Sequence, residues 1–158
     1  TYKNARDFGG DPDRIFVGGS SAGGHLTGMM VAGGWHDDFG IPEDTIKGAA
    51  PLSGLHDLEP VRRSCVNEWA KLDEDEARQN SPVHHLPNNG CPLIVSYGAS
   101  ETNEFKRQSA LLADAWTEKG WTSDLFEHPD RNHFDIVFDL GDPDSLLGKK
   151  MFAMIEGA

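Results

Sequence analysis

The stretch Phe16-Val17-Gly18-Gly19-Ser20-Ser21-Ala22-Gly23-Gly24-His25-Leu26 decides the fold of this chain. A short apolar run breaks into glycine and serine and resumes with helical spacing, which is the G-x-S-x-G pattern of a strand-turn-helix unit. We expect Gly19 and Gly23 to be required, because strand and helix backbones cross close to the serine and a Cβ would clash. Ser21 is predicted to lie exposed on a strained turn, with the N–H of Ala22 directed to where an oxyanion forms. The pattern favours acyl transfer to water.

Two other interpretations of this turn are a simple strand-to-helix connection and a phosphate-binding loop. A phosphate loop is disfavoured because no Gly-Lys-Ser or Gly-Lys-Thr follows the glycines. The segment from Arg14 to Val17 has the composition of a strand, and Leu26, Met29 and Met30 recur at helical spacing. This context is the one that a nucleophile elbow requires.

The composition is that of an acidic globular protein, with 158 residues, 37% hydrophobic residues and a formal net charge of −12. Binding to nucleic acid or to an anionic membrane is not expected, because the chain has no basic cluster to neutralise phosphates. Adjacent basic residues occur as three pairs, which are Arg62-Arg63, Lys106-Arg107 and Lys149-Lys150.

The two cysteines, Cys65 and Cys91, are far apart and have no metal-binding or redox spacing, so we expect two free or buried thiols. No stretch approaches the roughly 18 consecutive apolar residues of a membrane span, and the first residues lack a signal-peptide pattern. A reducing, cytoplasmic setting is therefore expected. The opening Thr1-Tyr2-Lys3-Asn4-Ala5 has the pattern of the end of a helix, which predicts a further segment upstream.

Strand and helix patterns alternate along the chain without repeats or a linker, which predicts one α/β domain over residues 1–158. A loop is expected over Trp35–Asp44. Residues 55–90 are irregular, with helical pieces at 67–72 and 74–79, and are predicted to form a cap or a pocket wall. The expected strands are residues 14–18, 46–52, 92–98 and 121–126, and the expected longer helices are 22–32, 104–119 and 143–155.

A serine nucleophile needs a base within hydrogen-bond reach and an acid that orients the base. In this fold the partners follow the serine in the order acid, then histidine. The histidine is expected in a loop after the last strand, which favours His133 in Arg131-Asn132-His133-Phe134-Asp135. His128 is the alternative, although a side chain at the end of a strand more often packs or caps.

The acid is expected in the loop after the preceding strand, where Ser96-Tyr97-Gly98-Ala99-Ser100-Glu101 places Glu101. The alternatives for Glu101 are a solvated loop carboxylate and a charge at a helix N-terminus, although Glu104 is nearer to that helix. Position alone favours Glu101 as the acid that orients His133.

The remaining histidines and loop carboxylates carry weaker signals. They lack the spacing of a zinc site, so neither a metal nor any other cofactor is expected. We expect His25 to be structural or to line a pocket, and two aspartates to fix loops. These residues are His25, His36, His56 and the His84-His85 pair, with Asp57 and Asp135.

The segment Gly10-Asp11-Pro12-Asp13-Arg14-Ile15, leading into the elbow, resembles carboxylesterases of the α/β-hydrolase family related to hormone-sensitive lipase. Other stretches narrow the resemblance to kynurenine formamidase (arylformamidase)-like hydrolases and together span nearly the whole chain. They are Ser53-Gly54-Leu55-His56-Asp57-Leu58, Glu76-Ala77-Arg78 with Ser81-Pro82, Glu104-Phe105-Lys106-Arg107-Gln108-Ser109 and Asn132-His133-Phe134-Asp135.

The resemblance implies the C-terminal portion of an α/β-hydrolase domain, with a mostly parallel sheet flanked by helices and the N-terminal strands missing. The family's acid is usually aspartate, where this chain has Glu101. The family also carries a His-Gly-Gly motif that completes the oxyanion hole, and this chain contains none. We therefore expect the segment alone to be a poor enzyme, or to need an upstream segment or a second chain. A homodimer is one arrangement left open.

The predicted function is that of a serine hydrolase acting on small carboxylic esters or aryl-formyl amides, with Ser21, Glu101 and His133 as the catalytic residues and the N–H of Ala22 in the oxyanion hole. The acyl and leaving groups cannot be chosen from the sequence. The alternative is a non-catalytic binding module, or an inactive fragment, on a hydrolase scaffold.

Overall fold

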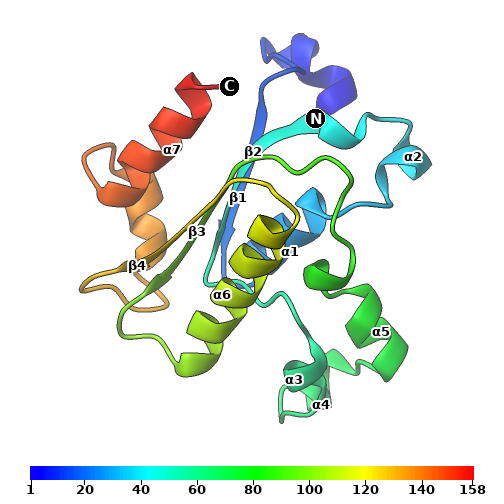
Figure 1. Ribbon diagram of the computed structural model, residues 1–158, viewed down its shortest axis with the longest axis vertical. Coiled ribbons are helices and arrows are strands. Elements are labelled where there is room, and N and C mark those ends of the chain that lie inside the picture. Colours follow the sequence, from blue (N-terminus) through cyan, green and yellow to red (C-terminus); the bar gives the residue numbers. More distant parts are fainter.

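A computed structural model describes residues 1–158 as a sheet with helices on both faces (Figure 1). The sheet has four parallel strands in the order β1-β2-β3-β4, which is also their order in the chain. A parallel sheet flanked by helices confirms the predicted fold class. The strands are β1 (Ile15–Ser20), β2 (Ile46–Leu52), β3 (Leu93–Gly98) and β4 (Ser123–His128).

The helices differ widely in length. The long ones connect or cover strands, and the short ones lie in the connecting segments (Figure 1). The α-helices are α1 (Ala22–Val31), α2 (His36–Phe39), α3 (Glu59–Arg62), α4 (Asn67–Ala70), α5 (Glu74–Gln79), α6 (Asn103–Glu118) and α7 (Leu146–Glu156). The 3₁₀ helices are η1 (Tyr2–Phe8), η2 (Glu43–Thr45), η3 (Pro82–His84) and η4 (Ile136–Gly141). None of the helices is long and apolar enough to cross a membrane.

Each face of the sheet has its own apolar cluster. On one face, Val31 of α1 and Leu112 and Trp116 of α6 pack with residues of β2 and β3. On the other, Leu147 of α7 packs with Ala50, Leu52 and Ile94. Burial on both faces explains why β2 and β3 are almost continuously apolar, as expected for central strands of a parallel sheet.

Two of the expected segments differ from the sequence interpretation. The loop expected over Trp35–Asp44 contains α2, a single turn that Gly40 ends in the left-handed conformation at φ 58°. The opening residues form the 3₁₀ helix η1, which ends at Gly9 with φ 75°. One-turn helices fall below the length at which apolar periodicity can be detected.

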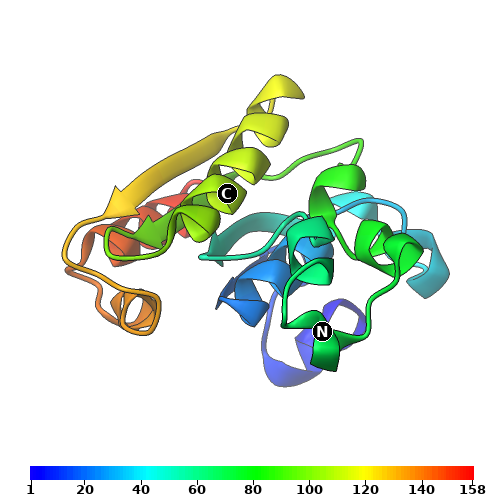
Figure 2. The same cartoon turned by 90° about the horizontal axis from the view of Figure 1, so that it is seen from below.

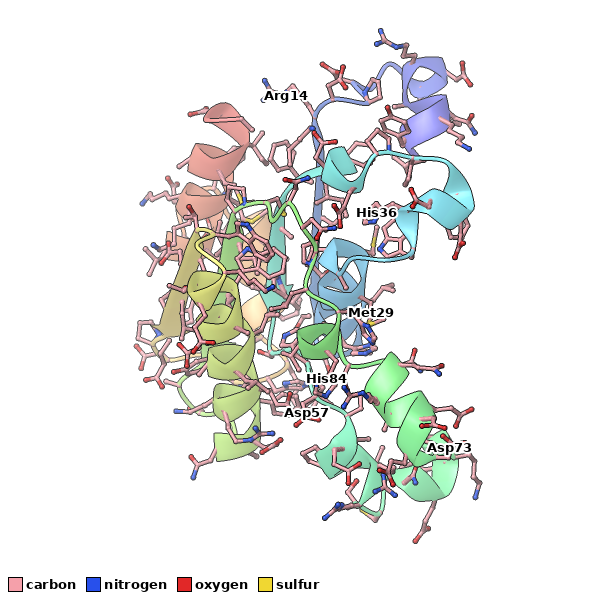
Figure 3. All side chains as sticks on the ribbon, turned by 45° about the vertical axis from the view of Figure 1, so that its right-hand side comes forward. Arg14, Met29, His36, Asp57, Asp73 and His84 are labelled. Atoms are coloured by element: carbon pink, nitrogen blue, oxygen red, sulfur yellow. The ribbon has the colours of Figure 1, made fainter.

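The parallel strands all end at one edge of the sheet. Two labelled residues in Figure 3 mark the opposite ends of the strands. Arg14 lies just before the start of β1, and Asp57 lies shortly after the end of β2. Strand pairing aligns Ser20 with Leu52, and Gly98 with His128, so the loops after the strands lie next to one another. Helices α3 and α4 project at this end, from which Figure 2 is viewed.

Residues 55–90 form the projecting segment, which the side chain of Gln108 on α6 attaches to the domain. The Gln108 carbonyl accepts bonds from the N–H groups of His56 and Asp57, both at 2.8 Å, and its NH₂ donates to the Asp57 carbonyl at 2.8 Å. Gln108 is fully buried, so these bonds are shielded from competing water. The role of this segment as a cap or pocket wall stays a prediction.

The turn between β1 and α1 needs small residues, although one of them was misassigned from the sequence. A Cβ on Gly19 would lie 2.6 Å from the Gly23 carbonyl oxygen, so Gly19 is required as expected. A Cβ on Gly23 would meet nothing within 4 Å, so the clash predicted for Gly23 is wrong. Gly24 takes that role, because its Cβ would lie 2.3 Å from the Leu52 carbonyl oxygen. The tight approach is between α1 and the end of β2.

Exchanging these two glycines for alanine should therefore have opposite effects on stability. Gly24→Ala is expected to destabilise the fold by about 1–3 kcal/mol, as overpacking does. Gly23→Ala, the matched control one position away, should be neutral or stabilising by up to about 1 kcal/mol, because alanine favours the helix. Urea unfolding of both variants measures this. Equal destabilisation by the two would contradict the packing described here.

His56 is a fully buried histidine in the loop after β2, and its ring packs against α1. Cβ atoms on Gly28 and Gly54 would each lie within 2.8 Å of its ring, so both glycines make room for it. Neither ring nitrogen bonds to another protein group. Burial, with a smaller contribution from nearby His25, lowers the pKa of His56 from 6.5 to about 3.

This shift makes stability depend on pH. Between pH 6.5 and about 3 the unfolded chain binds a proton on His56 that the folded chain does not, so stability falls as the pH is lowered through this window. The slope from one such group reaches about 1.4 kcal/mol per pH unit. We expect His56→Gln to flatten the dependence of unfolding free energy on pH, and His84→Gln, at an exposed position, to leave it unchanged. Parallel curves for parent and His56→Gln would refute this.

Candidate active site

Three polar side chains predicted from the sequence meet at the carboxyl edge of the sheet. Ser21 follows β1, Glu101 lies in the loop after β3 and His133 lies in the loop after β4. This edge faces the viewer in Figure 2. The three side chains form one continuous chain of hydrogen bonds, called below the Ser21–His133–Glu101 array.

Ser21 lies on the sharp turn between β1 and α1. Its backbone has φ 59° and ψ −116°, a conformation that non-glycine residues rarely adopt. The N–H of Ser21 donates to the Leu52 carbonyl at 3.0 Å, and its own carbonyl accepts from the His25 N–H at 2.9 Å. These bonds hold the sharp strand-to-helix turn, as expected of a nucleophile elbow.

His133 connects Ser21 to Glu101. Its Nδ1 lies 2.9 Å from Glu101 Oε2, and its Nε2 lies 2.8 Å from Ser21 Oγ. A carboxylate only accepts hydrogen bonds, so the proton resides on Nδ1 and Nε2 is free to accept from the Ser21 hydroxyl. The ring is therefore held in the tautomer of a general base for Ser21.

The Phe105 ring packs against the imidazole of His133, with ring centroids 4.2 Å apart. Leu112 and Trp116 of the same helix belong to the core cluster on that side of the sheet, and Phe105 does not. Phe105 lies in the first turn of α6, beyond the end of β3, where the helix extends over the loops.

Glu101 is the most enclosed member of the array. Its side chain is 0% exposed, whereas that of His133 is 20% exposed. Oε1 accepts the hydroxyl of Ser53 at 2.5 Å and the N–H of Gly98 at 2.8 Å, so both carboxylate oxygens are bonded. The contact with Ser53 was not predicted. The available signal was a polar residue directly after an apolar strand.

His128, the alternative base, lies elsewhere and has a different partner. Its Nε2 is 2.8 Å from Asp139 Oδ2, and Arg131 donates two bonds of 2.8 Å to the same carboxylate. The hydrogen bonds from Arg131 hold the pKa of Asp139 below its usual value. Asp139 is 2% exposed, so this cluster secures the segment that carries His133.

Short bonds also shape the loop around His133. Asp135 accepts from the backbone N–H of Asn132 at 2.6 Å and from its side-chain amide at 2.8 Å. The Arg131 carbonyl accepts the Ser100 N–H at 3.0 Å, which joins the loop that carries His133 to the loop that carries Glu101. Asp135 therefore fixes the loop, as the sequence predicts.

The other residues singled out from the sequence have local partners. The N–H of Ala22 is one of the first N–H groups of α1, which have no partner within the helix. His25 Nε2 lies 2.8 Å from the Asn80 carbonyl, and Asp57 accepts the N–H of Glu59 at 3.1 Å. Glu104 is paired with Arg107 at 2.7 Å, away from His133.

The two cysteines are free, with Cys65 exposed. Burial raises the pKa of the Cys91 thiol to about 12, so it remains protonated. No group of three or more histidine, cysteine, aspartate or glutamate side chains is arranged to hold a metal ion. The Ser21–His133–Glu101 array is therefore the candidate site at the carboxyl edge of the sheet.

A family model described as the prolyl oligopeptidase family matches residues 3–139, which include all three members of the array. The chain belongs to this family. The resemblance to esterases and kynurenine formamidases, and the α/β-hydrolase fold that it implies, are likewise confirmed by the individual relatives below.

Over 146 residues the chain is 32% identical to kynurenine formamidase of Danio rerio, an alignment covering 89% of this chain and 49% of that protein. It is 25% identical to esterase LipQ of Mycobacterium tuberculosis, covering 85% of this chain and 36% of the esterase. A crystal structure from Silicibacter sp., described provisionally as a thioesterase, superposes with a TM-score of 0.76 at 31% identity, covering 92% and 53% of the two chains. This chain thus spans about half the length of the first and third proteins.

The geometry predicts different outcomes for the two histidines after β4. His133→Ala removes the imidazole nitrogen that lies 2.8 Å from the Ser21 hydroxyl, and should slow labelling of Ser21 by a fluorophosphonate by at least about 100-fold, the usual scale of general-base catalysis. His128→Ala should leave the labelling of folded protein within a few-fold of the parent, since His128 contacts Asp139. Mass spectrometry of the adduct measures both rates. A larger loss in His128→Ala would contradict the assignment.

Proposed function

We propose that Ser21, His133 and Glu101 are the nucleophile, base and acid of a serine hydrolase acting on small carboxylic esters or aryl formamides. The observation that supports this best is the uninterrupted array, with bonds of 2.8 Å and 2.9 Å from the hydroxyl through the imidazole to a fully buried carboxylate. A structural serine or histidine has no need of this alignment beside a strained turn.

In the first half of the proposed reaction, Ser21 Oγ attacks the carbonyl carbon while its proton moves to His133 Nε2. The carbonyl oxygen becomes an oxyanion near the N–H of Ala22, which stabilises the developing charge. When the intermediate collapses, the bond to the leaving alcohol or amine breaks, and that group takes the proton from Nε2. Ser21 then carries the acyl or formyl group as an ester.

Water completes the cycle through the same base. It loses a proton to His133 Nε2 as its oxygen attacks the acyl carbon, and the bond to Ser21 breaks as Oγ takes this proton back. The product is the free acid, and every group returns to its starting state. Throughout, Glu101 holds Nδ1–H and stabilises the positive imidazolium.

The distribution of exposure supports these roles. Glu101 is sealed from solvent and bonded at both oxygens, so it can orient His133 with little reorganisation. His133 keeps some exposure, which a base needs in order to reach substrate and water. An aryl formamide as substrate is supported by the similarity to a protein named kynurenine formamidase, and a simple ester by the similarity to a named esterase.

The substitution that tests this function is Ser21→Ala, with Ser20→Ala as the matched control. Ser20 is the preceding residue and is the last of β1. Assayed in the full-length protein with a p-nitrophenyl ester, an aryl formamide and a prolyl peptide, Ser21→Ala should lower kcat by at least about 10⁴-fold on any accepted substrate. Ser20→Ala should keep most of the activity.

The pattern of results separates the proposal from its alternative. Loss of turnover in Ser21→Ala alone supports a serine hydrolase, and the three assays then identify the substrate class. Equal residual rates in Ser21→Ala and the parent would favour a non-catalytic binding module on a hydrolase scaffold.

A further inference from the structure

Ser53 is a fully buried polar residue that the reaction described above does not use. It directly follows β2 and lies between the nucleophile turn and the acid. Its hydroxyl is 2.5 Å from Glu101 Oε1, and its N–H donates to the Ser96 carbonyl at 2.8 Å. The backbone of Ser53 has φ 47°, in the left-handed region that serine rarely adopts.

We propose that Ser53 is a positioning residue, which holds Glu101 so that Oε2 is directed at His133 Nδ1; this role rests on the function proposed above. Glu101 Oε1 is the acceptor of the Ser53 hydroxyl proton. A carboxylate oxygen only accepts, so the Ser53 hydroxyl donates to Oε1. With the Gly98 N–H on the same oxygen, two donors fix Oε1, and Oε2 remains for His133.

The length of the acid makes this support necessary. Glutamate has one more rotatable bond than aspartate, so an unsupported Glu101 would populate more orientations of its carboxylate. The Gly98 N–H alone gives a single fixed point around which the carboxylate could turn. The bond from Ser53 adds a second point from a different strand end, which removes that freedom.

The place of Ser53 in the chain also couples the acid to the nucleophile. Its neighbour Leu52 accepts the N–H of Ser21 through its carbonyl, at 3.0 Å. The dipeptide Leu52-Ser53 at the end of β2 therefore holds the backbone of the nucleophile with its first residue and the acid with its second. A shift of this dipeptide would move both ends of the array together.

A structural explanation for Ser53 makes a different prediction. If the residue merely filled a tight, left-handed position, glycine would replace it without loss, since glycine accepts positive φ at no cost. If its hydroxyl orients Glu101, then Ser53→Gly and Ser53→Ala lose the same function, although Ser53→Gly keeps the backbone unstrained. Comparing the two variants therefore distinguishes a conformational role of the Ser53 backbone from a hydrogen-bonding role of its hydroxyl.

Ser96→Ala is the matched control. Ser96 is also fully buried and lies on β3, where its carbonyl accepts the Ser53 N–H, but its hydroxyl bonds to no other protein group. Removing this hydroxyl deletes a buried serine oxygen close to Ser53 without touching Glu101.

The experiment measures two properties of each variant in the full-length protein. One is kcat and KM on the substrate found for the parent, and the other is the low-field proton resonance of His133 Nδ1–H, which reports its bond to Glu101 without turnover. We expect Ser53→Ala and Ser53→Gly to lower kcat about 10-fold or more, the scale of a hydrogen bond to a charged group. KM should change less than about twofold, and the resonance should move or broaden. Ser96→Ala should resemble the parent in both measurements.

Parental kcat and an unmoved resonance in Ser53→Gly would overturn the positioning role. A loss in Ser53→Ala that Ser53→Gly restores would also overturn it, in favour of a purely conformational role. Failure of the proposed function has a separate signature, which is ester turnover that survives Ser21→Ala. In that case the resonance still decides whether Ser53 orients Glu101.

Discussion

The backbone of Ser21 imposes the constraint on which the rest of the molecule depends. A residue with a side chain is held at φ 59°, at a cost in free energy that surrounding contacts must offset. The Leu52 carbonyl binds its N–H, and Gly19 and Gly24 allow α1 to approach the strands closely enough to make that bond. Apolar clusters on both faces of the sheet keep α1 and β2 at this distance. The core thus stabilises the unfavourable turn that carries the half-buried hydroxyl of Ser21.

Bonds between loops, rather than within them, give the array its geometry. The loop that carries His133 joins the loop that carries Glu101 through the Ser100 N–H and the Arg131 carbonyl, and the end of β2 joins β3 through Ser53 and Ser96. Solvent exposure differs along this network, since the carboxylate of Glu101 is sealed and the imidazole of His133 is partly exposed. Dipoles fixed in this way act without having to reorganise during a reaction.

The sequence predicts much of this arrangement, because parallel strands bring their following loops to one edge. That rule placed Ser21, Glu101 and His133 together, although they are far apart in the chain. Local patterns could not show which glycine of the elbow meets the end of β2. The sequence predicts a close backbone contact at Gly23, whereas the contact is at Gly24. They also could not show that the Ser53 hydroxyl bonds to Glu101, or that the Phe105 ring packs against His133. Each of these depends on distances across the fold, and residue spacing along one element carries no information about them.

The separations along the chain also determine when this site comes into existence. Ser21 and His133 are 112 positions apart, Ser53 and Glu101 are 48 apart, and Glu101 and His133 are 32 apart. Contacts between distant positions require long loops to close, and they form late in folding compared with helices. The hydrogen bonds from Ser21 through His133 to Glu101 therefore form only when the loops after β1, β3 and β4 have come together. These hydrogen bonds are consequently a stringent marker of completed folding, sensitive to defects far from the serine that leave the helical content intact.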